Sequence, residues 1–327
     1  MAIGKSSAFK VYDDQYYGGQ WEVVAQNLAA FNAASGGTLQ LTSEGIVGTY
    51  QKEAFGQIIA SLISRRDLTS TATVTDLGMT MGEFINVKIN RKIGPVAQTI
   101  DSWKKIGESP EEFSFALGKL VAEAKMQDQV NTTIMSLAAA IYNQSTNVYD
   151  ATGQSTKTII HSHLVKGLSK MGDAAKNITA WVMHSKPYFD LIGAAVTDKI
   201  FGVANITIYD GTVATFGRPT LVIDAPGLFI EGNSYTDTYL TLGLTVGAAA
   251  TKESEPDTTI IQAVSGLEQL VYRLQGEYSY NIGLKGFKWD VSNGGANPTD
   301  VALALGTNWD LAATSYKHIG GVAILTQ

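Results

Sequence analysis

The chain has 327 residues, 45% of them hydrophobic, which is enough for a large buried core and about two domains and excludes a disordered chain. Its formal net charge is −6 and no run of Lys or Arg exceeds two residues, which excludes a dedicated nucleic-acid-binding protein, so we expect any contact with DNA to be loose and non-specific. Cysteine is absent, which excludes disulfide bonds, thiolate metal sites and cysteine nucleophiles.

Neither the start of the chain nor its longest apolar stretch predicts export or membrane insertion. Residues 1–19 contain no apolar run of the kind found in signal peptides. The longest apolar stretch, residues 238–251, is interrupted by Thr and Gly and falls short of the ~20 residues that a membrane helix needs. We expect a protein that is made in the cytoplasm and has no membrane partner. The low charged fraction of 17% and the 33 glycines favour a surface partly covered by neighbouring subunits, although glycine-rich turns in a β-rich monomer would give the same composition.

Two short amphipathic helices are predicted in the first part of the chain. Between residues 20 and 34 apolar side chains recur at helical spacing, and Gly36-Gly37 follows as a stop signal. Residues 51–65 show a similar spacing and predict the second helix. Neither helix is long enough to be stable alone.

Residues 69–99 change to a period of two, which is typical of β-strands. Thr alternates with Ala and Val over residues 71–75, and apolar and polar residues alternate again over residues 84–90. This predicts a long antiparallel hairpin with its turn around residues 78–82 and its end at Gly94-Pro95. Because an isolated hairpin is marginal in water, it must lie on its own domain or on a neighbouring subunit.

The clearest helix signal begins at Ser109. An N-cap Ser, a Pro at the first helical position and a Glu at the third form a capping box, and apolar residues then continue at helical spacing to Asn143. The predicted helix is about 52 Å long at 1.5 Å per residue. We expect it to act as the spine of a domain.

The second half of the chain predicts an α/β domain followed by strands. The expected order is a helix over residues 164–176, a strand over 178–184, a helix over 187–196, and strands over 206–209 and 220–223. Residues 253–257 are polar and predict a loop. Residues 269–290 resume as strand, with Tyr278 and Tyr280 on one face.

Two clusters of polar residues are candidates for functional sites. His161 and His163 would share one face of a strand, but two ligands do not make a zinc site, and the alternative is a strand end or helix entry. His184, Ser185 and Asp190 lie within one turn and lack the Gly-x-Ser-x-Gly elbow of a hydrolase, so Ser185 fits better as a helix N-cap. We predict no catalytic residue, no cofactor and no metal, and a protein that is not an enzyme.

One further pair of residues is better suited to a structural role than to catalysis. Glu111 and Glu112 are adjacent on a helix and do not face each other, so they suit the positive end of the helix dipole better than acid–base catalysis. No glycine-rich phosphate-binding motif occurs in the sequence.

Four segments, taken together, carry a family resemblance. Residues 65–95, with Arg65-Arg66-Asp67 before the alternating stretch, look like the end of an N-terminal arm and an extended loop, and the helix from Ser109 occupies the place of a spine helix. Residues 278–289, YSYNIGLKGFKW, are similar to an aromatic strand followed by His-Pro-x-Gly-Phe-x-Trp, with Gly-Leu in place of His-Pro. Residues 297–320 look like a closing segment. From about residue 50 to its end, the chain resembles the major capsid proteins of tailed bacteriophages with the Hong Kong 97 type fold.

The resemblance implies an α+β fold and a structural protein that self-assembles into the icosahedral shell around phage double-stranded DNA. It implies five segments: an N-terminal arm (1–68), an extended β-hairpin loop (69–105), a peripheral domain with a long spine helix (106–155), an axial α/β domain (156–236), and return strands with a C-terminal segment (237–327).

In such a shell the hairpin would lie across the neighbouring subunit, and the basic cluster Lys88, Arg91 and Lys92 would meet carboxylates there. The same charges could instead be solvated and protect an exposed edge from aggregation. The resemblance points to nine candidate intersubunit contacts: Arg65, Arg66, Asp67, Phe84, Lys88, Arg91, Lys92, Lys104 and Lys105.

The expected partners are further copies of the chain, arranged as pentamers and hexamers. No long helical extension precedes the arm-like segment, so we expect a separate scaffolding protein and a portal, with a decoration protein as a further candidate partner. Two alternatives stay open: the shell protein of a cellular nanocompartment with the same fold, and an unrelated α/β hydrolase or transferase.

Overall fold

The computed structural model describes residues 29, 31–42, 49–56, 65, 68–71, 73, 81–99, 110–202, 217–232, 237–264, 266, 268 and 271–327. These residues form a five-stranded sheet, a six-stranded sheet, a small two-stranded sheet and a long helix, α3. One hydrophobic core contains side chains from α3 and from all three sheets. The predicted α+β class is confirmed.

The five-stranded sheet has the order β1-β9-β10-β3-β2. Its long members are β3 (Met81–Thr99), β9 (Ala249–Val264) and β10 (Val271–Leu284), and they run antiparallel to their neighbours in this group. The short edge strands are β1 (Leu39–Thr42) and β2 (Tyr50–Gly56).

The period-two pattern in residues 84–90 correctly predicts a strand, but its predicted partner is wrong. Ile85, Val87 and Ile89 are buried, as alternation requires, and the strand continues through Gly94-Pro95 to Thr99. Its two neighbours are β10 and β2 of the same chain. Residues 68–71 are not strand, so the predicted hairpin within 69–99 does not form in the described residues, and β3 needs no neighbouring subunit to support it.

The prediction of a helix over residues 51–65 is wrong for residues 51–56, which form a strand. Residues 50–56 are β2, paired with β3 from Tyr50 opposite Val87 to Gly56 opposite Met81. Most of the apolar residues that suggested a helix come after Gly56 and, apart from Arg65, residues 57–67 lie outside the described residues. Near the N-terminus, residues 31–34 are helical and Gly36 and Gly37 turn with positive φ, which confirms the predicted end of the first helix.

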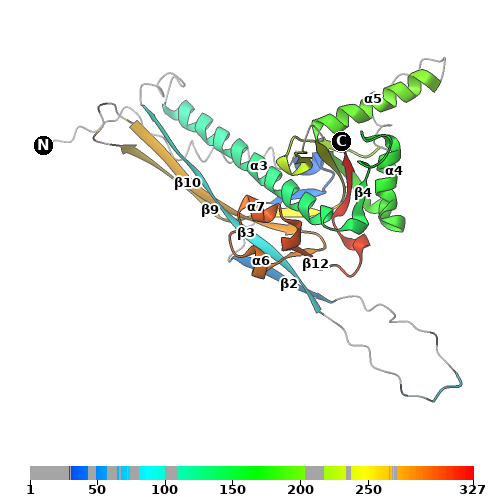
Figure 1. Ribbon diagram of the computed structural model, residues 1–327. Coiled ribbons are helices and arrows are strands. Elements are labelled where there is room, and N and C mark those ends of the chain that lie inside the picture. The colour runs from blue at the N-terminus through cyan, green and yellow to red at the C-terminus, as the bar shows by residue number, and fades with distance from the viewer. Residues whose placement is uncertain are drawn as a thin grey trace.

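Away from β1 and β2, the sheet narrows to a three-stranded ribbon. We use "ribbon" for residues 89–99 of β3, 253–264 of β9 and 271–280 of β10. Pairing with β2 covers residues 81–87 of β3, and pairing with β1 covers residues 249–252 of β9. Beyond them, no described strand lies on the outer edges of the ribbon, which runs diagonally alongside α3 (Figure 1).

The loop predicted at residues 253–257 is wrong, because these residues lie inside β9. The pairing of β9 with β10 shifts register twice here, between Glu277 and Ser279 and between Ser279 and Tyr280. Such bulges admit extra residues into a strand and redirect their side chains. The polar residues that suggested a loop are therefore accommodated by an irregular strand.

The spine helix is confirmed almost to its predicted limits. α3 spans Pro110–Tyr142, 33 residues, or about 50 Å at 1.5 Å per residue. Its C-terminal half packs into the core through Ile134, Leu137 and Ile141, which are fully buried. The predicted cap Ser109 lies outside the described residues.

The six-stranded sheet has the order β4-β13-β8-β5-β6, with β7 paired to β8. Its strands are β4 (Val148–Asp150), β5 (Ile178–Met183), β6 (Thr220–Val222), β7 (Phe229–Ile230), β8 (Thr238–Thr245) and β13 (Gly321–Thr326). The helices α4 (His161–Ser169) and α5 (Ser185–Gly202) belong to this part of the fold. The predicted helix–strand–helix–strand order is confirmed over the described residues, while the strand predicted over 206–209 lies outside them.

Residues 285–320 close the structure over the end of α3. They contain the paired strands β11 (Phe287–Trp289) and β12 (Trp309–Leu311) and the short helices α6 (Val291–Gly294) and α7 (Asp300–Leu303). The last strand, β13, then returns to the six-stranded sheet between β4 and β8. The segment from residue 285 to residue 327 therefore contributes strands to the two-stranded and the six-stranded sheet.

Candidate functional site

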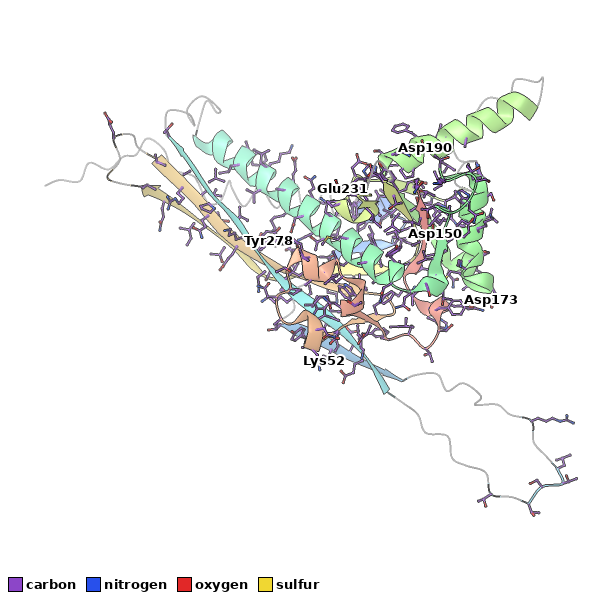
Figure 2. The ribbon with its side chains drawn as sticks, in the orientation of Figure 1. Lys52, Asp150, Asp173, Asp190, Glu231 and Tyr278 are labelled. Carbon is purple, nitrogen blue, oxygen red and sulfur yellow. The ribbon has the colours of Figure 1, made fainter. Side chains whose placement is uncertain are left out.

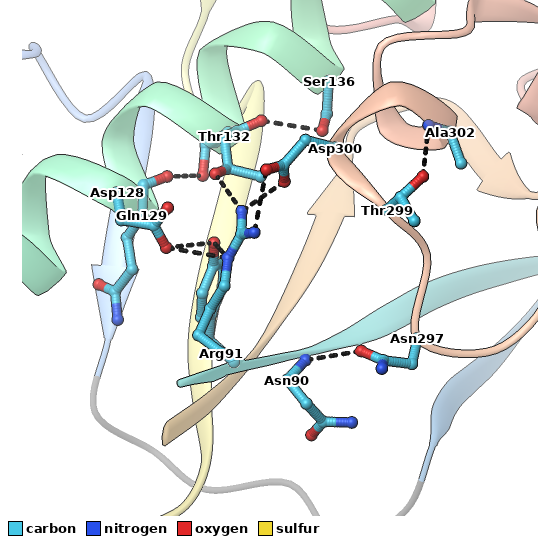
Figure 3. Close-up of polar contacts among 12 residues, drawn as sticks. Asn90, Arg91, Asp128, Gln129, Thr132, Ser136, Asn297, Thr299, Asp300 and Ala302 are labelled. Atoms are coloured by element: carbon cyan, nitrogen blue, oxygen red, sulfur yellow. Dashed lines mark hydrogen bonds and ion pairs between the residues drawn. The ribbon is translucent and has the colours of Figure 1, made fainter. Parts of the chain in front are cut away.

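The guanidinium group of Arg91 joins three parts of the fold (Figure 3). Arg91 lies in β3, and its Nε donates to Oδ2 of Asp128 in α3 at 3.1 Å. Nη1 and Nη2 donate to the two carboxylate oxygens of Asp300 in α7 at 3.1 and 2.6 Å, and Nη2 donates to the hydroxyl of Thr132 at 3.0 Å. A two-point arginine–carboxylate contact is directional as well as strong, so it fixes the position of α7 on the sheet and the spine helix.

Two tyrosines complete this network. The hydroxyls of Tyr278 and Tyr280 donate to Oδ2 of Asp128 at 2.7 and 3.0 Å, and their rings stack with centroids 5.9 Å apart, which confirms that they share a face of β10. Burial and the hydrogen bond to Asp128 raise the pKa of Tyr278, and burial and the charge of Asp128 raise the pKa of Tyr280.

The surroundings of Arg91 favour the charged form of its guanidinium group. Burial acts to lower the pKa of Arg91, but its hydrogen bond with Asp300 and the neighbouring Tyr280 and Asp128 outweigh burial and raise it. The guanidinium therefore stays charged and the two phenols stay protonated donors. The network is suited to holding parts together and not to moving protons.

The closing segment is docked by local caps as well as by Arg91. The side-chain carbonyl of Asn297, whose φ of 51° is left-handed, accepts the backbone N–H of Asn90 at 2.9 Å. Thr299 caps α7 by accepting the N–H of Ala302 at 3.2 Å. Asn297 and Thr299 thus present Asp300 to Arg91.

The segment that resembles the aromatic strand and turn of the family has the packing of a buried corner. Gly286 has a φ of 84°, and a Cβ there would lie 2.8 Å from Cα of Ile319, so only glycine fits. Phe287 and Trp289 are buried, and the ring of Trp289 meets that of Trp309 edge-on at 4.8 Å. The substitution of Gly-Leu for His-Pro leaves this turn intact.

The face of the ribbon that points away from α3 is open to solvent. Tyr278, labelled in Figure 2, lies on the opposite side, where the ribbon meets the helix. The open face forms a shallow groove lined by polar and apolar side chains, and Ile260 there is 54% exposed. Eight residues line the groove: Lys92, Thr258, Ile260, Gln262, Arg273, Gln275, Gly276 and Glu277.

The nine candidate contact residues fall into three groups. Arg65 and Lys92 are exposed, whereas Phe84 is half-buried. Lys88 is only 9% exposed, and the hydrogen bonds of Arg91 described above are all made within its own chain. The remaining four, Arg66, Asp67, Lys104 and Lys105, lie outside the described residues. Sequence reasoning singled out Arg91 and its need for a carboxylate but missed Asp128 and Asp300.

The residues considered for catalysis and metal binding have structural roles. His161 and His163 lie in helix α4 and not on a strand, and His163 is 3% exposed. Asp190 pairs with Lys186 at 2.8 Å. Within the part of the chain that the structure describes, no three His, Asp or Glu side chains gather as metal ligands, and no helix there is long and apolar enough to cross a bilayer.

The His184 region is a helix start. Nδ1 of His184 lies 3.4 Å from Oγ of Ser185 and 3.3 Å from Oδ1 of Asp224, so a single ring nitrogen meets both groups and cannot relay a proton between them. α5 begins at Ser185, whose N–H donates to Asp224 at 3.0 Å. The capping role predicted for Ser185 belongs to Asp224.

Solved structures of phage capsids are similar to this chain. The capsid of Ralstonia phage GP4 matches with a TM-score of 0.50 and 10% identity over 88% of this chain and 87% of that chain. The Cyanophage Pam1 capsid matches with a TM-score of 0.49 and 10% identity over 88% of each chain, and the capsid of Helicobacter pylori bacteriophage KHP30 with 0.49 and 8% over 89% and 88%. No curated protein sequence matches the chain. The fold is that of the Hong Kong 97 type of capsid protein.

The family is shown by sequence. The model of the family described as "Major capsid protein 13-like" matches residues 8–323, nearly the whole chain, and the chain belongs to this family of major capsid proteins. It is a structural protein of a phage capsid, and capsid proteins are components of the virion. Neither the hydrolase nor the nanocompartment alternative is favoured.

Proposed function

We propose that copies of the chain assemble as pentamers and hexamers into an icosahedral shell that encloses double-stranded DNA. In this proposal the chain is made in the host cytoplasm and assembles with a separate scaffolding protein and a portal, and a decoration protein can bind the finished shell. Contact with DNA is loose, in keeping with a net charge of −6.

The open ribbon is the observation that carries this proposal. A sheet that has no described strand along the outer edges of the ribbon and that exposes Ile260 on its open face is suited to association with another protein surface. The same ribbon is fixed to α3 through the Arg91 network, so it presents a rigid surface. We infer that a neighbouring copy covers the open face.

Lys92 is the candidate contact that suits this surface best, because it is exposed and lines the groove on the open face of the ribbon. Arg65 is also exposed and remains a proposed contact. An exposed ion pair contributes only about 0.2 to 1 kcal/mol, so cohesion comes from many such contacts repeated around a closed shell. Arg66, Asp67, Phe84, Lys104 and Lys105 remain proposed contacts. For Lys88 and Arg91 we propose a supporting role within the subunit.

Electron microscopy of the chain, expressed alone and with its scaffolding protein, tests the proposal. We expect closed particles of uniform size. Ile260→Asp places a charge on the open face and should prevent particles while leaving a folded subunit, whereas Ile260→Val keeps the face apolar and should assemble normally. A chain that stays monomeric under every condition would refute the shell proposal, and normal assembly of Ile260→Asp would refute the role of this face.

A further inference from the structure

Lys125 is a buried amine between two carboxylates. It lies in α3, and its side chain is 5% exposed. Its Nζ donates to Oδ2 of Asp257 and lies 3.6 Å from Oε1 of Glu253, both in β9. The side chains of Asp257 and Glu253 are 15% and 30% exposed. The ring of Tyr278 forms a wall of the site, with its centroid 5.1 Å from Nζ.

The irregular part of β9 builds this site. The two register shifts between β9 and β10 fall opposite residues 253–258, the stretch that contains both carboxylates. Because bulges turn side chains out of the regular alternation, the strand can aim Glu253 and Asp257 at the helix that covers it. A buried lysine needs only one carboxylate for charge balance, so the second carboxylate is available for another role.

We propose that Lys125 and Asp257 become joined by an intrachain amide bond, with Glu253 as the proton shuttle. The ion pair first passes one proton from the ammonium to the Asp257 carboxylate, which gives an amine and a carboxylic acid. Nζ then attacks Cγ of Asp257, and Glu253 takes a proton from the nitrogen and delivers one to the departing hydroxyl. The Cγ–N bond forms, the Cγ–O bond breaks, one water leaves, and no oxidant or reductant is needed.

The geometry favours this condensation in three ways. The nucleophile and the electrophilic carboxyl are already in contact, which removes the entropic cost of bringing them together. Glu253 is close enough to Nζ to exchange protons after a small adjustment. Burial under α3 and beside Tyr278 limits water, which would otherwise hydrolyse or outcompete the bond.

A second lysine–aspartate pair, which is exposed to solvent, shows how burial distinguishes the Lys125 site. Lys317 and Asp173 approach to 2.5 Å, but their side chains are 35% and 82% exposed. Water reaches this pair freely, so we expect it to remain an ion pair. The contrast makes Lys317 and Asp173 an internal negative control for the proposed bond.

The bond would tie the spine helix to an edge strand of the ribbon. Lys125 and Asp257 are 132 positions apart in sequence. A covalent link there would prevent the ribbon from separating from α3, so the surface proposed for assembly could not peel away from the body of the subunit.

The mass of the purified, fully denatured chain tests this proposal. We expect the wild type to be lighter than its sequence mass by one water, and Lys125→Arg and Asp257→Ala to have their full sequence masses. Glu253→Gln keeps the size of the side chain but cannot shuttle protons, so its linked fraction should fall several-fold. Protease digestion and tandem mass spectrometry should yield a branched peptide that contains both Lys125 and Asp257, and none that joins Lys317 to Asp173.

Cyclisation at Asp210-Gly211 would also remove one water, so the branched peptide is the decisive observation. A wild-type chain of full sequence mass, or a water loss that persists in Lys125→Arg, overturns the proposal. Complete linkage in Glu253→Gln overturns the role of Glu253. The measurement uses the denatured subunit, so its failure would leave the shell proposal untouched.

Discussion

At the scale of single residues, Arg91 shows that a sequence can predict the need for a carboxylate partner without predicting which carboxylates it will be. A basic residue in a predicted strand has to find a carboxylate or water. Its partners Asp128 and Asp300 lie 37 and 209 positions away, and only the fold brings them together. The caps at Asn297 and Thr299 follow local rules, so the start of α7 could have been predicted from the sequence. Its contact with β3 could not.

Replacement of Arg91 by Ala should destabilise the subunit. The change leaves the Asp128 and Asp300 carboxylates without their cation and loosens α7 from the sheet. We expect a loss of about 2 kcal/mol in the free energy of unfolding, below the full cost of breaking a deeply buried pair because Asp300 is 55% exposed. Urea unfolding followed by tryptophan fluorescence measures it. Lys92→Ala, an exposed neighbour, should change stability by less than about 0.5 kcal/mol, and equal losses in the two variants would contradict the account.

His163 should make the subunit less stable in mild acid. Burial and the charge of Lys166 lower its pKa, and a backbone hydrogen bond with Thr158 opposes them only in part. The unfolded chain therefore takes up a proton near pH ~6.5, while the folded chain does so only at lower pH, so stability falls as pH drops through this window. The slope is at most about 1.4 kcal/mol per pH unit.

Unfolding titrations between about pH 7 and about pH 5 check the role of His163. The variant His163→Phe removes the titrating group, and its stability should depend less on pH than that of the wild type. Val165→Thr changes an exposed apolar side chain on the same helix and should keep the wild-type slope. An unchanged slope in His163→Phe would show that His163 does not cause the acid sensitivity.

At the scale of elements, the clear helix and strand patterns in the sequence predicted α3 and β3 correctly, whereas the ambiguous patterns did not predict their elements. The capping pattern and helical spacing located α3, and period two located β3. The stretch 253–257 was misassigned because its charges are typical of loops, whereas Lys125 and the bulges of β9 accommodate them inside a strand. Strand partners were not predictable, because pairing of β3 with β10 depends on contacts between distant parts of the chain.

The turn at Gly286 offers a test of one element. Gly286 and Gly266 both have positive φ, at 84° and 90°, so an alanine at either position meets backbone strain of about 1 kcal/mol. A Cβ at Gly286 would also clash with the backbone of Ile319, whereas no described residue has an atom within 4 Å of a Cβ at Gly266. We expect Gly286→Ala to lower the melting temperature clearly more than Gly266→Ala, and equal effects would contradict the close packing of this corner.

At the scale of the whole molecule, the account rests on a ribbon that is held firmly on one side and open on the other. The Arg91 network and the Lys125 site attach the ribbon to α3, while its other face carries Ile260 and Lys92. The sequence predicted a marginally stable hairpin over residues 69–99 that would require support from its own domain or a neighbouring subunit. The prediction of this hairpin was wrong, because β3 is paired with β10 and β2 of its own chain. The family assignment holds because it depends on the whole order of elements and on residues 8–323.

A reconstruction of assembled particles by electron cryomicroscopy tests the central claim most directly. The account predicts closed shells in which the face of the ribbon lined by Lys92, Ile260 and Arg273 is covered by an adjacent copy. Shells in which this face is fully open to solvent would contradict the proposed interface, and preparations with no closed particles, even with a scaffolding protein present, would contradict the function itself.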